Sequence, residues 1–178
     1  LRAAKTAFGH RLMRDGVVPG GVAIDLDAVK LTAIRTVVAE IRRQFPKLVA
    51  IYDDTSSLQD RTVTSGVLAP ELARRYGAGG YVGRASGRNF DARRMPGCSP
   101  YDVLRFDVPV LVEGDVNARV WIRIREVEQS LSLVEQIADR LPVGQTLGVI
   151  PQAREPREGF ALVEGFRGDV LAWLRLGA

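Results

Sequence analysis

The longest regular pattern in the sequence lies at residues 115–141, DVNARVWIRIREVEQSLSLVEQIADRL. Apolar residues recur there in steps of four and three, at Val116, Val120, Ile124, Val127, Leu131, Val134, Ala138 and Leu141. This spacing lines one face of an α-helix of about seven turns, which Pro142 and Gly144 end. Charged residues on the other faces, such as Glu126 and Glu135, indicate a solvated or pairing surface rather than a catalytic one.

A second apolar stripe predicts another long helix, from Leu26 to about Tyr52. Asp25 is the expected N-cap of this helix. Pro46 lies inside the stripe, and a proline there removes a backbone donor and clashes with the preceding turn. We therefore expect a kink or short break near Gln44.

The remaining segments predict shorter elements. Residues 2–14 have helical spacing, and Pro70 and Gly77 bracket a short helix. A Gly- and Arg-rich region at 77–109 is expected to be mostly ordered loop with one short helical turn. Strands are expected at 145–150, 160–164 and 169–176, and the last two should form a hairpin.

These elements predict a mainly α (α+β) fold, a long-helix bundle with a small antiparallel β element at its C-terminal end. Residues 1–142 would form the helical scaffold and residues 143–178 a hairpin region of the same domain. The 178 residues, with 46% apolar content, suffice for one globular domain.

The sequence contains no apolar stretch of the roughly 18 to 20 residues that a spanning helix needs, and no signal peptide. A soluble or membrane-peripheral protein is expected. The chain opens at Leu1 and stops directly after a strand-like run, so we expect it to be part of a longer protein.

A single cysteine, Cys98, cannot form an intramolecular disulfide or a thiolate cage, which favours a cytoplasmic setting. The formal charge is +4, and only three of the 25 basic residues are lysines. Arginine in such excess suits forked pairing with carboxylates, so a protein interface explains it as well as nucleic acid does.

Few residues point to catalysis. His10 is the only histidine, and its helical setting favours a surface or interface role. The glycines at 77–83 lack the Gly-Lys-Ser/Thr and the spacing of a nucleotide loop. Arginines interleaved with aromatic residues at 74–101 would suit a nucleic-acid surface, but nearby aspartates such as Asp91 offset part of the charge, so nucleic acid is the less favoured partner.

A series of short motifs covers residues 60–142. Arg84-Ala85-Ser86-Gly87 is followed by Asp91, by Arg93 or Arg94, and then by a Pro-Tyr-Asp at 100–102. Blocks at 60–61, 106–109 and 113–119 agree in order and spacing, and pieces at 9–11, 19–22 and 163–169 extend the match.

This series resembles that of the electron-accepting large subunit shared by respiratory NADH:quinone oxidoreductases, where it is the 49 kDa-type subunit, and membrane-bound NiFe hydrogenases. Asp60-Arg61 and the Val-Glu-Gly-x-Arg-Gly stretch at 163–168 favour the formate-hydrogenlyase or energy-converting hydrogenase branch. The chain would be a central-to-C-terminal fragment of such a subunit.

The resemblance implies a scaffold beneath the active cavity, beside a small subunit that carries iron–sulfur clusters, at the inner face of the cell membrane. The family's nickel–iron ligands and most of its quinone-associated residues lie outside the matched region, so no catalytic residue, metal ligand or cofactor is expected here and the fragment should have no turnover alone. The parent complex would hold quinone or Ni–Fe.

Seven residues are the candidates for the cavity or subunit interface: Pro19, Gly20, Gly21, Arg84, Ser86, Asp91 and Arg93. His10 is a candidate for proximity to a cluster, although its offset differs from that of the family histidine. An equally open interpretation is that Arg84 and Asp91 merely pair to hold the loop. A relative that has lost its metal ligands and acts as a structural or interaction module is the main alternative function.

Overall fold

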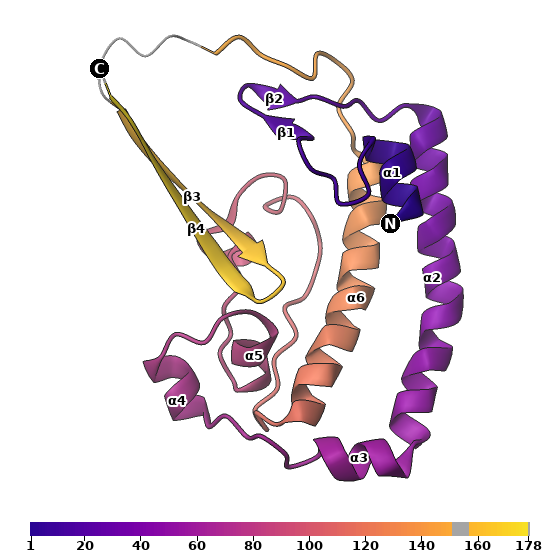
Figure 1. Ribbon diagram of the computed structural model, residues 1–178, viewed down its shortest axis with the longest axis vertical. Coiled ribbons are helices and arrows are strands. Elements are labelled where there is room, and N and C mark those ends of the chain that lie inside the picture. The colour runs from indigo at the N-terminus through magenta and orange to yellow at the C-terminus, as the bar shows by residue number, and fades with distance from the viewer. Residues whose placement is uncertain (151–156, 178) are drawn as a thin grey trace.

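The computed structural model describes residues 1–150 and 157–177, and its elements are mainly helical (Figure 1). The helices are α1 (Arg2–Phe8), α2 (Ala28–Asp54), α3 (Ser56–Thr62), α4 (Pro70–Arg75), α5 (Gly80–Ala85), a π-type turn η1 (Arg93–Gly97) and α6 (Val116–Asp139). The strands are β1 (Val17–Val18), β2 (Gly21–Val22), β3 (Arg157–Gly165) and β4 (Gly168–Leu176). The predicted α+β class, with a small antiparallel element near the C-terminus, is confirmed.

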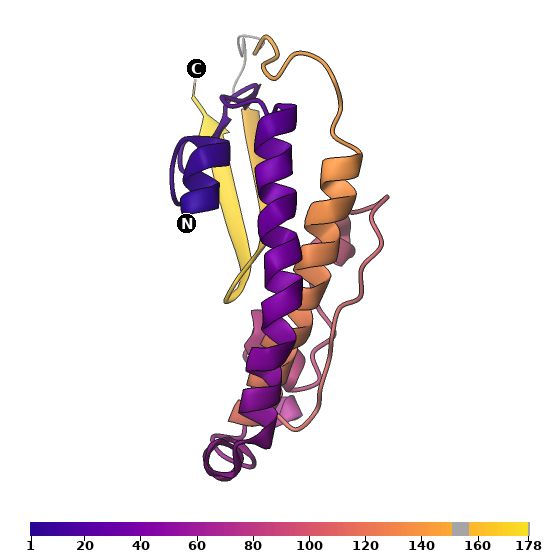
Figure 2. The ribbon, with the colours of Figure 1, turned by 90° about the vertical axis from the view of Figure 1, so that its right-hand side faces the viewer.

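The two long helices, α2 and α6, lie side by side and run antiparallel (Figures 1 and 2). Arg42 of α2 pairs with Glu135 of α6, with Nη2 and Oε2 2.6 Å apart. Toward the other end of the pair, the Tyr52 hydroxyl donates to Asn117 Oδ1 at 2.9 Å. α3 continues from α2 at that end.

Aspartates cap both long helices. Asp115 accepts a hydrogen bond from the backbone N of Ala118 at 2.7 Å, which satisfies one of the donors left free at the start of α6. Asp27 does the same for α2 by accepting from Lys30 N at 2.8 Å. The prediction of Asp25 as the N-cap of α2 is therefore wrong, because the cap is Asp27, two residues further on.

α2 runs without a break through Pro46 to Asp54, so the break expected near Gln44 is wrong. A proline at this position leaves the carbonyl of Arg42 without its helical donor. Arg42 and Pro46 are both exposed, so water can hydrate that carbonyl.

Two short helices differ from the sequence-based prediction. α1 ends at Phe8 rather than near residue 14, because Gly9 takes the left-handed conformation, with φ 71°, and closes the helix. α3 is absent from the helices expected from the sequence, and α2 extends two residues beyond Tyr52 to Asp54.

The strand predicted at 145–150 is reduced to a single bridge between Leu147 and Gly21. Around that bridge, Val22 N donates to Thr146 O at 2.9 Å and Gly148 N donates to Gly20 O at 2.8 Å. The segment is thus tied to the β1–β2 hairpin without forming a strand of its own.

The predicted C-terminal hairpin is confirmed. β3 and β4 pair antiparallel from Arg157↔Leu176 to Gly165↔Gly168, so Phe166 and Arg167 form the connection. In Figure 1 the turn of the hairpin lies near α5, while the rest stands apart from the helices.

Two small clusters of buried apolar side chains lie within the described residues. One joins α5 and α6 through Ala85, Ala118 and Ile122, and the other packs Leu104 and Phe106 against α6. Ala118 and Ile122 lie outside the predicted stripe of α6, because α5 packs on that side of the helix.

The chain exposes 12662 Å² to solvent, whereas a compact monomer of 19.5 kDa exposes about 8,500 Å². Many large apolar side chains are among the exposed ones. Val29, Leu48 and Ile51 on α2 are each more than 60% exposed. The predicted stripe of α2 is therefore largely uncovered in this chain.

Candidate functional site

The loop predicted at 77–109 is built around α5, whose start is fixed by a close contact with the hairpin. Gly80 has φ 56°, and a Cβ placed on it would lie 2.5 Å from the backbone N of Gly168. Only glycine permits this approach. The contact places the turn of β3–β4 against α5 and orients Arg84, one turn further on, toward α6.

Arg84 is 2% exposed and joins three parts of the fold. Its Nε donates to Glu126 Oε1 of α6 at 2.8 Å, and its Nη1 donates to Glu164 Oε1 of β3 at 2.8 Å. Nη1 also donates to the Phe90 carbonyl at 3.1 Å. Burial alone would lower the pKa of Arg84, but its bonds to Glu164 and Glu126 outweigh burial and raise it.

Asp91 is also 2% exposed and binds Arg93 through both carboxylate oxygens. Arg93 Nε and Nη2 lie 2.9 Å from Oδ1 and 2.6 Å from Oδ2, a forked pair. Arg84 Nη1 lies 3.7 Å from Asp91 Oδ2. Burial would raise the pKa of Asp91, but the side-chain and backbone hydrogen bonds from Arg93 hold it below its ordinary value.

Arg84, Asp91, Arg93, Glu126 and Glu164 thus form one connected set, which we call the arginine network. A buried charge is stable only when it is paired and hydrogen-bonded. The network meets that condition from within the chain, and it also ties Glu164 Oε2 to the backbone N of Ala92 at 3.0 Å. Three of the predicted interface residues therefore lie together.

Sequence reasoning missed two members of the network, Glu126 and Glu164, as partners of Arg84. They are 42 and 80 positions from Arg84 in the chain. The signal that points to them is indirect, because a buried guanidinium requires carboxylates as partners.

The aromatic residues among the arginines are used inside the fold. The Arg93 and Arg94 guanidiniums lie 5.0 and 4.5 Å from the centre of the Phe106 ring. Arg88 lies 4.6 Å from the ring centre of Phe90. Arginines stacked in this way hold the loop in place.

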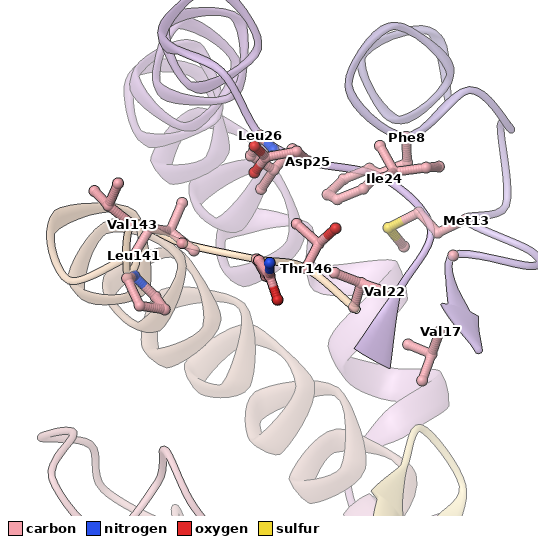
Figure 3. Close-up of a pocket in the computed structure, with 14 residues that line it drawn as sticks. Phe8, Met13, Val17, Val22, Ile24, Asp25, Leu26, Leu141, Val143 and Thr146 are labelled. Carbon is pink, nitrogen blue, oxygen red and sulfur yellow. The ribbon is translucent and has the colours of Figure 1, made fainter. Parts of the chain in front are cut away.

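The other predicted interface residues lie elsewhere. Pro19 and Gly20 form the turn between β1 and β2, with Gly20 at φ 90°, and Gly21 pairs with Leu147. Val17 and Val22, on either side of this turn, help to line an apolar cavity of about 510 Å³ that is shown in Figure 3. The prediction that this turn and the arginine loop both lie near the cavity or interface of the parent protein stays a prediction.

A second cavity, of about 410 Å³, borders the arginine network and is lined by Arg84, Arg93, Arg123, Glu126 and Glu164 among others. The Arg123 guanidinium lies 4.9 Å from the centre of the Phe166 ring in the hairpin turn. This cavity lies where α6, the arginine loop and the hairpin meet.

The remaining candidate residues are Ser86 and His10. Ser86 is 1% exposed, and its Oγ has no hydrogen-bond partner among the described residues. His10 is half-buried, and its Nδ1 accepts from the backbone N of Leu12 at 3.1 Å. His10 thereby stabilises the turn after α1.

Within residues 1–150 and 157–177, no group of three or more His, Cys, Asp or Glu side chains is placed to hold a metal ion. In the same residues, no helix has the length and apolar content needed to cross a bilayer.

The arrangement of elements is shared with a chain of a solved respiratory complex. The structure of the membrane-bound sulfane sulfur reductase, an archaeal respiratory membrane complex, contains a chain that matches with a TM-score of 0.89 and 29% sequence identity. The match covers 98% of this chain and 49% of that one.

The chain belongs to the family of the 49 kDa subunit of respiratory-chain NADH dehydrogenase, whose family model matches residues 1–163. The D-type subunit of the NADH-quinone oxidoreductase of Desulfotalea psychrophila is 36% identical over 157 residues, which are 84% of this chain. A D-type subunit of the same enzyme from a Roseiflexus species is 36% identical over 177 residues, and subunit 4 of the Thermus thermophilus enzyme is 30% identical over 148.

This chain spans less than half the length of these relatives, 41% of the Desulfotalea protein and 46% of the Roseiflexus protein. The resemblance to the 49 kDa-type family noted from the sequence motifs is confirmed. The chain thus matches part of the length of D-type subunits, and these relatives are subunits of respiratory complexes.

Proposed function

We propose that this chain is the scaffold part of the large subunit of a membrane-associated respiratory oxidoreductase. In this role it supports the redox cavity beside an iron–sulfur subunit at the inner face of the cell membrane. The observation that carries the proposal is the family match over residues 1–163. The arginine network gives it a physical basis, because it fixes α5, α6 and β3 against one another.

The extent of uncovered apolar surface supports a role inside a complex. An area several thousand Å² above that of a compact monomer is the size of an obligate interface. Exposed large apolar residues are found on α2 and on the β3–β4 hairpin. Such a surface needs other protein segments to cover it.

In the proposed role, the described residues supply no ligand to a metal or a cluster. They contain no suitable group of three donors, and the one thiol, Cys98, is exposed. In this role a partner subunit holds the clusters, and the parent complex holds quinone or Ni–Fe. The contribution of residues 1–178 would be shape and fixed charge.

Two branches of the family are candidates for the parent complex. The motifs at 60–61 and 163–168 resemble the formate-hydrogenlyase and energy-converting hydrogenase branch. The curated relatives compared above carry NADH-quinone oxidoreductase names, which favours the quinone branch. The scaffold role is the same in both branches.

Purification of the full-length subunit from native membranes tests the proposal. An affinity tag on this subunit should recover a complex that contains a cluster-bearing subunit, detected by electron paramagnetic resonance after reduction. Recovery of the subunit alone, or of a complex without cluster signals, would overturn the scaffold role in electron transfer. A complex of that kind would support a structural or interaction module.

The same preparation separates the branches. Stoichiometric nickel with hydrogen oxidation or evolution identifies the hydrogenase branch, whereas quinone reduction without nickel identifies the quinone branch. Either result is compatible with the proposed scaffold role.

A further inference from the structure

The strand β4 has the composition of a strand that is buried on both faces. Residues 170–174, Val-Leu-Ala-Trp-Leu, are all apolar and contain no charge or proline. Strands with one solvated face alternate apolar and polar residues, whereas strands covered on both faces read as continuous apolar runs. β4 follows the second pattern.

Its side chains are nevertheless exposed on both faces. The pairs Phe160↔Trp173 and Leu162↔Leu171 share one face of the hairpin, and Val163↔Val170 lies on the other. Trp173 is 61% exposed on the first face, and Leu174 is 63% exposed on the second. A two-stranded hairpin left this way is at best marginally stable in water.

The long edges of the hairpin are free as well. β3 and β4 form a sheet of two strands, and no backbone hydrogen bond joins either strand to another element of the described chain. Proteins protect exposed edges with charges, prolines or bulges. The five central residues of β4 carry no such protection.

Firm attachment is confined to the turn end. There Gly168 meets Gly80 of α5, and Glu164 binds Arg84 and the backbone N of Ala92. These contacts fix the position and direction of the hairpin relative to the helices, while the far end stands clear of them (Figure 1).

We propose that β4 is an internal strand of a larger sheet, and that the strand added along its free edge comes from the remaining half of the same large subunit. The proposal rests on the proposed function, because it takes the parent to be a full-length member of the family. The turn contacts act as the anchor that sets this sheet against the helical scaffold. The proposed partner segment thus supplies a strand that pairs with the free edge of β4, and apolar side chains that cover both faces of the hairpin.

Size favours this occupant over a second copy of the chain. The matching chain of the archaeal complex is about twice as long as the aligned region, and this chain spans less than half of its curated relatives. The uncovered area is several thousand Å², which corresponds to an obligate interface rather than to a transient one.

Amide hydrogen exchange on the purified full-length complex tests the strand addition. We expect every amide from Val170 to Leu174 to be protected, because both edges of β4 would be hydrogen-bonded. Fast exchange at every second amide would show a free edge in the assembled protein and would overturn the inference. The cluster signals of the same complex report on the proposed function separately, so the two proposals can fail independently.

The two faces are tested by Leu171→Lys and Leu174→Lys, introduced separately into the full-length subunit. Each should reduce the amount of assembled complex at least tenfold, whereas Leu171→Val and Leu174→Val should assemble normally. Loss with only one of the lysine variants would show that one face is solvated and would overturn two-sided burial.

The occupant is identified with Arg175→Lys, which adds an amine at the exposed end of β4. Chemical cross-links from this lysine should reach residues of the same subunit outside the 178-residue region. Cross-links mainly to a second copy, or to another subunit, would overturn the assignment of the occupant.

Discussion

The arginine network and the β3–β4 hairpin meet at Glu164, yet they differ in whether their side chains find partners within the chain. In the network every buried charge finds its partner within the chain, as Arg84 does with Glu126 and Glu164. In the hairpin, large apolar side chains such as Trp173 are mostly exposed. The chain therefore pairs the buried charges of the network internally but leaves the large apolar side chains of the hairpin exposed.

The difference shows which interactions this part of the chain must make within itself. An unpaired buried charge costs several kcal/mol, so the network has to be closed within the segment that folds around it. Apolar surface costs about 25 cal/mol per Å² while it is exposed, and it can be covered later by another segment. Changes to the network should therefore damage the chain itself, and changes to the hairpin should damage its assembly.

The largest effect is expected for Arg84→Met, compared with Arg42→Met as a matched control. Both arginines pair with glutamate on α6, but Arg84 is buried and Arg42 is exposed. Removing Arg84 leaves Glu164 and Glu126 without their cation and should cost about 3–5 kcal/mol, whereas the surface pair should contribute at most about 1 kcal/mol.

Urea denaturation of the purified full-length complex, followed by limited proteolysis, measures both variants. Equal stability of the two would show that burial of the network is unimportant and would break the comparison with the hairpin.

A smaller loss is expected for Gly80→Ala, which affects the contact between network and hairpin. Alanine is strained at φ 56°, and its Cβ would lie 2.5 Å from Gly168 N. The expected destabilisation is about 1–3 kcal/mol. Gly159→Ala is the control, because a Cβ there meets nothing within 4 Å. Thermal unfolding that shifts equally for both variants would exclude a special role of the turn contact.

The smallest effect concerns acid stability through Asp91. Its pKa is lower in the folded chain than the ordinary value near 4, so the pair with Arg93 stabilises the fold above about pH 4. That stabilisation is lost as the pH falls from about 4 toward the folded-state pKa. Asp91→Asn should flatten the dependence of unfolding on pH in this range, while Asp102→Asn, an exposed control, should leave it unchanged.

A steep acid dependence that persists in Asp91→Asn would assign the effect to other carboxylates. The measurement is the midpoint of urea unfolding between about pH 2.5 and 6.

Local patterns predicted the elements that depend on neighbouring residues. The helix at 115–141 became α6, the helix punctuated by Pro70 and Gly77 became α4, and the hairpin formed where it was expected. Errors arose where tertiary contacts decide the outcome. The segment at 145–150 lies against β2 instead of forming a strand, and α2 continues through Pro46, which lies on an exposed side of the helix.

The site was predictable only in part for the same reason. Arg84, Asp91 and Arg93 lie within ten positions of one another, and their motif drew attention to them. The glutamates that complete the network come from α6 and β3, and no local periodicity links them to α5. The interpretation that Arg84 and Asp91 pair to hold the loop was left open by the sequence, and the geometry agrees with it. A contact between the network and a partner subunit belongs to the proposed function.

The antiparallel pairing of α2 with α6 has a further consequence for the electric field of the molecule. Each long helix carries partial charges of about +0.5 at its start and −0.5 at its end. Because Tyr52, near the end of α2, meets Asn117, near the start of α6, opposite poles lie side by side and their fields largely cancel. The potential that a neighbouring redox centre would experience is then set by ionised side chains rather than by the backbone.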